Sequence, residues 1–148
     1  MRTGGVVPKP SIRSSTSGVC ITLPMSFLLD PATPLFARIS YAAADPYAVT
    51  VLFCTQDQSV QWVFARDLLA DGLIEEAGHG DVHVWPIADD SDARSVGVEL
   101  DSPDGVVELT ARRRDITRFL EATYRLVPRG AESAHLDIDA ELAILCAD

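Results

Sequence analysis

The segment from Asp45 to Pro86 places the strongest constraint on what this chain can fold into. Apolar side chains alternate through residues 49–54 and 60–65, and the polar residues 56–59 separate the two runs. Successive side chains of a strand point to opposite faces, so the two runs predict a β-hairpin with both faces partly covered: Leu52, Cys54 and Val63 make one face partly apolar, and the other face is mainly apolar. The residues expected on that face are Val49, Val51, Phe53, Val60, Trp62 and Phe64.

A short helix is predicted directly after this hairpin, from Arg66 to Asp71, with Gly72 in the left-handed position that often follows a helix end. Residues 78–81 then predict a second loop. Val82 and Val84 alternate with His83 and Trp85 in a further strand, which Pro86 is expected to stop.

The chain before the hairpin predicts two antiparallel strands, Val19 to Leu29 and Leu35 to Tyr41, joined by a turn over residues 30–34. Pro24 lacks a backbone donor, which confines the first of these strands to an edge or a bulge at that point.

The last third of the chain changes period. Strands 96–100 and 107–109 are expected to pair across the turn at residues 102–105. The apolar residues from Ile116 to Val127 then recur at helical spacing, and a final helix is expected over residues 137–146. Strands followed by helices indicate an α+β fold with an antiparallel sheet.

Three motifs in this order resemble the SsgA-like family of actinobacterial sporulation and cell division proteins. They are Asp45-Pro46-Tyr47-Ala48-Val49, the run from Val60 to Gly72, and the run from Gly80 to Pro86. The wording Trp62-Val63-Phe64-Ala65-Arg66-Asp67-Leu68-Leu69 is most similar to the SsgB type.

The resemblance implies a strongly bent antiparallel sheet of about six to seven strands, a short helix after the central hairpin and two C-terminal helices. It also implies an architecture similar to the whirly-type single-strand-binding proteins. The work implied is non-enzymatic: septum-site selection or septum assembly through contacts with division proteins such as the GTPase FtsZ or other SsgA-like proteins. The resemblance further suggests a homo-oligomer, possibly a trimer.

The charge of the chain is unevenly distributed. The net charge is −10, yet residues 1–18 carry three basic residues and no acid, which leaves −13 for residues 19–148. Residues 1–18 are poor in large apolar side chains and predict a flexible tail, with a single domain over residues 19–148. An acidic body repels a phosphate backbone, so nucleic-acid binding is disfavoured. Arg112, Arg113, Arg114 and Arg118 could form a local basic patch, and the alternative is that they are the solvated first turns of a helix.

Cellular location follows from cysteine number and hydropathy. Three cysteines without paired spacing argue against a disulfide framework and favour a reducing cytoplasm. No signal peptide and no apolar run of about 20 residues is evident, so any membrane association would go through a partner. We expect a cytoplasmic protein that is recruited to division septa.

No catalytic residue, metal site, cofactor or small-molecule substrate is expected. His79 and His83 have the spacing of two ligands on a helix, but the surrounding glycines predict a turn, where that spacing loses its meaning. Asp89, Asp90 and Asp92 lack the glycine and distal glutamate of a calcium loop. The sequence also shows no activated nucleophile and no phosphate-binding glycine loop.

A partner or oligomer surface is predicted around the short helix and the loop that follows it. Its candidate residues are Arg66, Asp67, Asp71, Glu75, Glu76, His79, Asp81, His83 and Trp85. Arg66 and Asp67 could instead form a buried ion pair or a cap, and Trp62 and Phe64 are expected in the core. Family members commonly carry arginine at the position of His83, and often a basic residue and proline where this chain has Glu75-Glu76-Ala77. The alternative function is a single-strand nucleic-acid-binding or transcription-regulating module.

Overall fold

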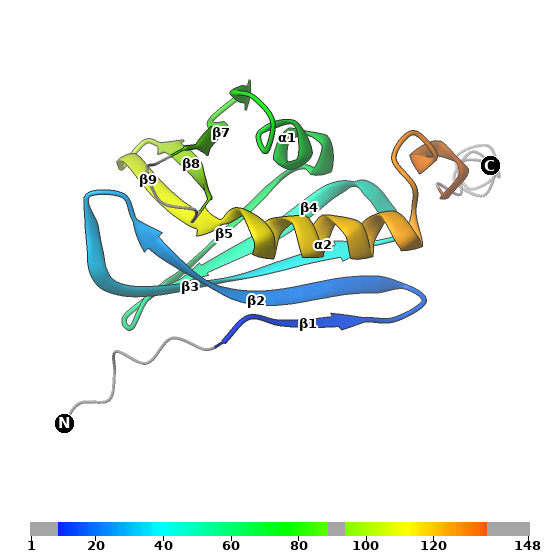
Figure 1. Cartoon of the computed structure of the whole chain (residues 1–148), viewed down its shortest axis with the longest axis horizontal. Coiled ribbons are helices and arrows are strands. Elements are labelled where there is room, and N and C mark those ends of the chain that lie inside the picture. Colours follow the sequence, from blue (N-terminus) through cyan, green and yellow to red (C-terminus); the bar gives the residue numbers. More distant parts are fainter. Residues whose placement is uncertain (1–8, 89–93, 136–148) are drawn as a thin grey trace, which may run out of the picture.

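The computed structural model describes residues 9–88 and 94–135. Nine strands form one antiparallel sheet in this part of the chain, in the order β5-β4-β3-β2-β9-β8-β7-β6, with β1 beside β2 (Figure 1). The strands are β1 (Ser11–Ser14), β2 (Gly18–Phe27), β3 (Asp30–Ala42), β4 (Asp45–Cys54), β5 (Ser59–Ala65), β6 (Ala77–His79), β7 (Val82–Ile87), β8 (Ser95–Ser102) and β9 (Gly105–Arg112). The helices are α1 (Arg66–Asp71), α2 (Arg113–Leu126) and the 3-10 helix η1 (Glu132–His135).

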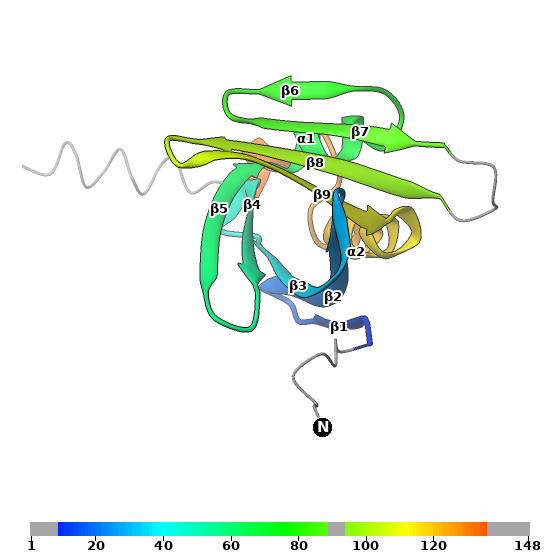
Figure 2. The same ribbon diagram turned by 90° about the vertical axis from the view of Figure 1, so that its left-hand side faces the viewer.

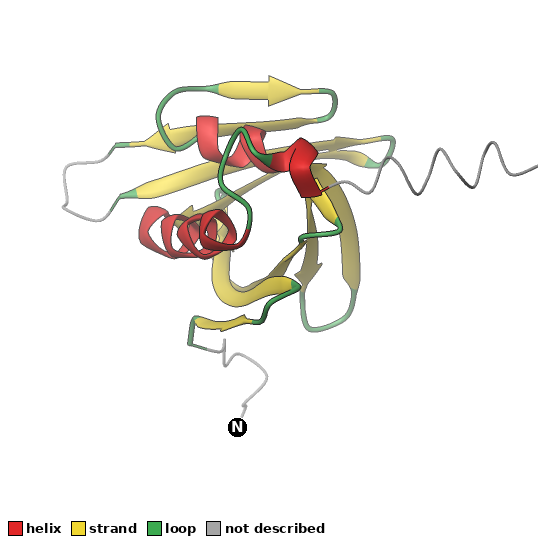
Figure 3. Cartoon of the chain, turned by 90° about the vertical axis from the view of Figure 1, so that its right-hand side faces the viewer, coloured by secondary structure: helices red, strands yellow, loops and turns green. Residues whose placement is uncertain are grey.

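The sheet curls strongly, and β2 is the strand at which its two halves meet (Figure 2). β2 pairs with β3 along most of its length but with β9 only over Met25–Phe27. The helices lie between the halves (Figure 3). α2 packs against β2, β8 and β9, and α1 packs against β4, β6 and β7, so each helix contacts both halves of the sheet.

The predicted pairing of the first two long strands is confirmed, but their turn lies elsewhere. β2 and β3 pair antiparallel, and the turn is Leu28–Leu29, so the turn predicted over residues 30–34 is wrong. These residues begin β3 despite their two prolines. Pro24 lies between the part of β2 that pairs with β1 and the part that pairs with β9. On this edge of β2 no described strand pairs with Pro24, so its missing backbone N–H costs no hydrogen bond there.

A strand also forms inside the segment for which the sequence predicts a flexible tail. Residues 11–14 make β1, which pairs antiparallel with residues 19–22 of β2. Ile12 packs partly against the core. The apolar content of this segment is low, but backbone hydrogen bonds to the neighbouring strand β2 can order it, and these bonds do not depend on the side chains of the segment.

The central hairpin forms as predicted. β4 pairs with β5 so that Val49 faces Phe64 and Val51 faces Trp62. The β4 members of the predicted face are buried, whereas Trp62 and Phe64 are half-buried and Val60 is exposed. β5 is an edge strand of the sheet, which explains its lower burial.

The short helix α1 has the predicted bounds, but Gly72 is not left-handed. Its φ of −67° and ψ of −13° are helical. A Cβ at this position would collide with the side chain of Val84 in β7. Glycine is therefore required by the close approach of α1 to the sheet and not by backbone conformation.

The region after α1 is more regular than the sequence predicts. Residues 77–79 form β6, which includes the first two residues of the predicted loop, and the turn is reduced to Gly80 and Asp81, with Gly80 at φ 63°. Pro86 does not stop β7, which runs to Ile87. β6 pairs with β7 only as far as Val84, so Pro86 lies where one edge of β7 has no partner among the described strands.

The β8–β9 hairpin and α2 confirm the predictions for the last third. Val98 pairs with Leu109 and Leu100 with Val107. The predicted apolar face of α2 is buried, with Phe119 and Val127 fully enclosed.

The coarse fold, a strongly bent antiparallel sheet with few helices, is thus confirmed. The predicted strand number of six to seven is too low, because β1 and β6 are short strands in segments without strand-like alternation. The final helix predicted over residues 137–146 lies outside the described residues, and the whirly-type likeness stays a prediction.

Candidate functional site

Arg66 begins α1, and its side chain is fully buried, with 0% exposed. Its guanidinium donates hydrogen bonds to the Val127 carbonyl oxygen at 2.7 Å and to Glu132 Oε2 at 2.9 Å. The rings of Tyr41 and Tyr124 lie 4.7 and 4.8 Å from its central carbon, close enough for cation–π attraction. A buried charge needs such partners, because removing it from water is costly.

The prediction that Arg66 belongs to an exposed partner surface is therefore wrong. The alternative prediction, that Arg66 forms a buried ion pair, is confirmed. Its partner is Glu132, however, and not the predicted neighbour Asp67. No local pattern could have revealed this pair, because 66 positions separate the two residues. The hydrogen bond from Arg66 holds the pKa of the Glu132 carboxyl below its ordinary value, against the opposing effect of burial.

Asp67 and Asp71 lie four residues apart on α1 and so project from one side of the helix. Both are about half-exposed, and both contact Arg129. The Arg129 Nε atom lies 3.1 Å from Asp67 Oδ1, and its Nη2 atom lies 2.7 Å from Asp71 Oδ1. The hydrogen bond to Asp71 raises the pKa of Arg129. This side of α1 therefore presents an ion-pair network at the surface.

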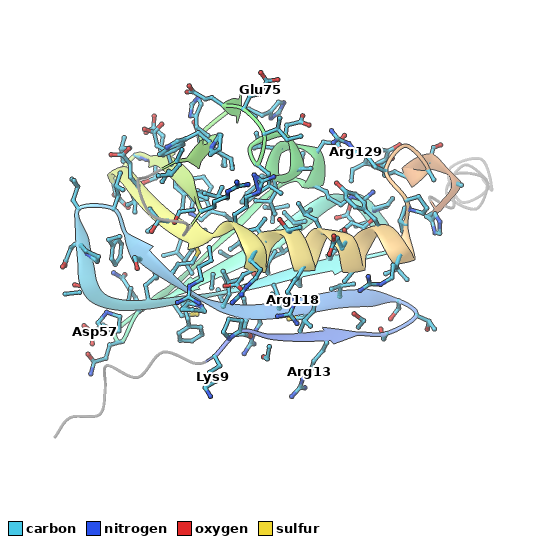
Figure 4. The ribbon with its side chains drawn as sticks, in the orientation of Figure 1. Lys9, Arg13, Asp57, Glu75, Arg118 and Arg129 are labelled. Atoms are coloured by element: carbon cyan, nitrogen blue, oxygen red, sulfur yellow. The ribbon has the colours of Figure 1, made fainter. Side chains whose placement is uncertain are left out.

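The predicted residues after α1 come from the segment before β6, from β6 and from the β6–β7 turn, and Figure 4 labels Glu75 at the top of the view. Glu75, Glu76, His79 and Asp81 are all exposed. Ile74 is 75% exposed beside them, although sequence reasoning did not select it. Its signal in the sequence is an apolar residue directly before two acids, outside the predicted helix. We call Ile74, Glu75, Glu76, His79 and Asp81 the α1–β6 surface.

His83 and Trp85 lie on the outer face of β7 and are half-buried. His83 Nδ1 lies 3.2 Å from Glu99 Oε1 on β8, which is ion-pair distance but not hydrogen-bonding geometry. The Trp85 indole covers Gly97, its cross-strand partner, where a Cβ would collide with the ring. The structure thus brings His83 and Trp85 onto the sheet beside the α1–β6 surface rather than into it.

His79 and His83 do not form a paired metal site. Gly78, and not His79, is the cross-strand partner of His83. Within residues 9–88 and 94–135, no group of three or more potential metal ligands comes together. Asp89, Asp90 and Asp92 lie outside the described residues.

Open grooves lie on the surface of the described part of the chain, and two of them bear on function. One, of about 440 Å³, lies between the two ends of the curled sheet and is lined by aromatic residues of β4 and β5 and by the β6–β7 turn. It brings Tyr47, Trp62 and Phe64 next to His79 and Asp81. The other groove, of about 830 Å³, lies between β2, β9 and the first turns of α2.

Comparison with known proteins decides the family. Residues 35–132 match the family model described as Streptomyces sporulation and cell division protein, SsgA. This chain belongs to the SsgA-like family. The matched residues run from β3 to η1 and so include Arg66 and Glu132 of the buried pair.

Relatives in the SsgA-like family are named sporulation-specific cell division protein SsgB. The chain is 44% identical to that of Thermobifida fusca over 134 residues, which cover 87% of this chain and 96% of the relative. It is 42% identical to that of Streptomyces coelicolor over 125 residues, covering 80% and 87% of the two chains. The sequence resemblance to the SsgA-like family is thereby confirmed.

Solved structures agree with the assignment. The crystal structure of an SsgA-like sporulation-specific cell division protein from Thermobifida fusca matches with a TM-score of 0.76 and 40% identity, over 88% of this chain and 98% of that one. A structure of SsgB, described with mutations that correlate to longitudinal cell division during sporulation of Streptomyces coelicolor, matches with a TM-score of 0.75 and 38% identity, over 84% and 100% of the two chains.

The described helices offer no candidate for a membrane span, since none combines the required length with sufficient hydropathy.

Proposed function

We propose that this protein is a non-enzymatic adaptor for septum-site selection or septum assembly in sporulation-linked cell division. The observation that carries the proposal is the similarity to proteins named sporulation-specific cell division protein SsgB over most of both chains. The adaptor acts by binding division proteins, including FtsZ or other SsgA-like proteins, in the cytoplasm. It reaches the septal membrane only through these partners.

The α1–β6 surface is the proposed partner site. An exposed isoleucine followed directly by two glutamates is a suitable contact, because an apolar anchor supplies binding energy and the neighbouring charges select the partner. Asp67 and Asp71 lie beside it, but Arg129 already pairs with both. The proposed contacts are therefore Ile74, Glu75, Glu76, His79 and Asp81, with His83 and Trp85 at the margin.

Charge reversal tests this surface. We expect the double substitution Glu75→Lys and Glu76→Lys to abolish septal localisation of a fluorescently tagged protein in a sporulating host, with the melting temperature unchanged. The matched control is Asp57→Lys, an exposed carboxylate in the β4–β5 turn that lies far from Glu75 (Figure 4). Septal localisation of the Glu75/Glu76 variant, or loss of its folding, contradicts the proposed role.

A homo-oligomer, with a trimer as the expected form, is the second part of the proposal. β5 is an edge strand with Val60 48% and Val63 56% exposed, and an apolar edge must be covered to prevent uncontrolled pairing. Sedimentation at micromolar concentration is expected to show the oligomer, and Val63→Lys is expected to weaken it. A monomer at that concentration contradicts this part of the proposal and leaves the adaptor role intact.

A further inference from the structure

The larger groove carries a concentration of positive charge that is unusual for a chain of net charge −10. Five arginines line it, together with a floor that includes Pro24, Met25 and Ala111. The arginines come from three separate elements or their flanks and are Arg94, Arg112, Arg113, Arg114 and Arg118. The sequence indicates only the run in residues 112–118. The fold adds Arg94 and the floor, and we call the result the arginine groove.

Most of this charge is available to a ligand. Arg94, Arg112, Arg114 and Arg118 are exposed, whereas Arg113 is half-buried and donates a hydrogen bond to the Leu73 carbonyl oxygen at 3.0 Å. The ion pairs found among the described residues involve none of the five. Among the described residues, Glu121 supplies the one carboxylate that lines the groove, so the balance of charge of these residues is strongly positive.

We propose that the arginine groove binds an acidic peptide segment of a partner protein. Arginine guanidinium groups recognise carboxylates in a planar, bidentate manner, and several in one groove fit a run of them. Met25 and Ala111 also line the groove, but only 7% and 4% of their surface is exposed, so the arginines supply most of the surface that a peptide can contact.

An acidic peptide fits better than a nucleic acid for two reasons. Single-strand binding relies on aromatic side chains that stack on bases, and none of the described residues that line this groove is aromatic. A nucleic acid also extends its charge beyond the groove, where the strongly acidic remainder of the chain repels it. A short peptide places its charge only where the arginines are.

The site is separate from the α1–β6 surface. Figure 4 shows Arg118 on the side of α2 that faces β2, away from Glu75. The proposal therefore does not depend on the adaptor role, and the two can fail independently.

Fluorescence anisotropy with a labelled peptide of Glu-Glu-Leu repeats tests the proposal on the full chain. We expect saturable binding that weakens as ionic strength rises from about 0.01 M to about 0.15 M, since the Debye length shortens from about 30 Å to about 8 Å. The double substitution Arg114→Glu and Arg118→Glu is expected to weaken binding about tenfold or more. A peptide with Gln in place of Glu is expected not to bind.

The matched control is Arg125→Glu, an exposed arginine of α2 that does not line the groove. It changes the net charge by half as much as the double variant and is expected to leave affinity within about twofold, since an isolated surface charge contributes little. Circular dichroism establishes that each variant is folded. If Arg114→Glu/Arg118→Glu does not fold, Arg114→Gln/Arg118→Gln replaces it, with the same loss expected.

Four outcomes overturn the proposal: no saturable binding, unchanged affinity in the groove variant, equal losses in the groove and control variants, or tighter binding of single-stranded oligothymidine than of the peptide. Sedimentation of the same variants tests whether a second copy of this chain occupies the groove instead of a peptide. If the groove variant alone loses an oligomeric state of the wild type, the groove holds a second copy of this chain, and the proposal is wrong.

Discussion

Arg66 and Glu132 form an ion pair of 2.9 Å inside the protein, although 66 positions separate them in the sequence. Arg66 begins α1 and Glu132 begins η1, so the pair fixes the end of the described chain to the helix that follows the central hairpin. The Glu132 Oε1 atom also accepts a hydrogen bond from the Gly130 backbone nitrogen at 2.8 Å. These contacts fix the first residue of α1, and the α1–β6 surface follows the other end of that helix.

Replacing the buried arginine is expected to cost much of the stability of the domain. Arg66→Met removes the hydrogen bonds to Val127 and Glu132 and leaves a buried carboxylate without its partner. We expect a loss of about 3–5 kcal/mol in the free energy of unfolding, measured by urea denaturation. Arg125→Met, the same substitution at an exposed position of α2, is expected to stay within about 0.5 kcal/mol. A similar small effect for both variants contradicts the role assigned to Arg66.

The same pair predicts a pH dependence at the acid end. The pKa of Glu132 is lowered from its ordinary value of 4.5 in the folded state, so its contribution is present above that value and is lost as pH falls through the lowered folded pKa. We expect Glu132→Gln to be less stable than wild type at neutral pH and the two melting temperatures to converge below about pH 4.5. Parallel pH curves for the two proteins contradict this expectation.

The ion pairs of Arg129 are expected to matter far less. Arg129 contacts Asp67 and Asp71 at the surface, where water and salt screen the attraction. Arg129→Gln is expected to lower the free energy of unfolding by no more than about 1 kcal/mol, and less at high salt. Chemical denaturation at two salt concentrations measures this. If Arg129→Gln loses as much free energy of unfolding as Arg66→Met, this expectation is wrong, and the contacts of Arg129 with Asp67 and Asp71 order the segment between α2 and η1.

Close packing, and not backbone conformation, explains Gly72. Gly72→Ala places a Cβ against Val84, and we expect a loss of about 1–3 kcal/mol from overpacking. Adding Val84→Ala makes room for part of the new group, so the double variant is expected to be more stable than the sum of the single losses predicts. Gly80→Ala serves as the control, because nothing lies near a Cβ there and its cost comes from a φ of 63°. Val84→Ala should therefore not reduce the cost of Gly80→Ala.

Much of the fold could be predicted because its signals are local. The β4–β5 hairpin, α1 and the buried face of α2 follow from alternation and helical spacing over a few residues each. The sequence predicts the turn between β2 and β3 at the wrong position, because the prolines in residues 30–34 are typical of a turn. Leu28 and Leu29, which form the turn, are not. β1 and β6 were missed because each is ordered by a neighbouring strand and not by its own pattern.

The candidate surface divides in the same way. The exposure of Glu75, Glu76 and Asp81 could be predicted from polarity, since charged side chains avoid burial unless they are paired. The burial of Arg66 could not, because its acceptors lie on α2, on the segment after it and on η1. The charge of a residue predicts exposure wrongly when its hydrogen-bond partners lie far away in the sequence but close in the fold.

The sequence by itself determined the strands with clear alternation, the helices with a clear apolar face, the family and the acidic character of the chain. Only the tertiary structure decided which charges are buried, how β1 and β6 join the sheet and that five arginines line one groove. The reason is physical: periodicity acts between neighbours along the chain, whereas desolvation and pairing of charges depend on which segments the curled sheet brings together.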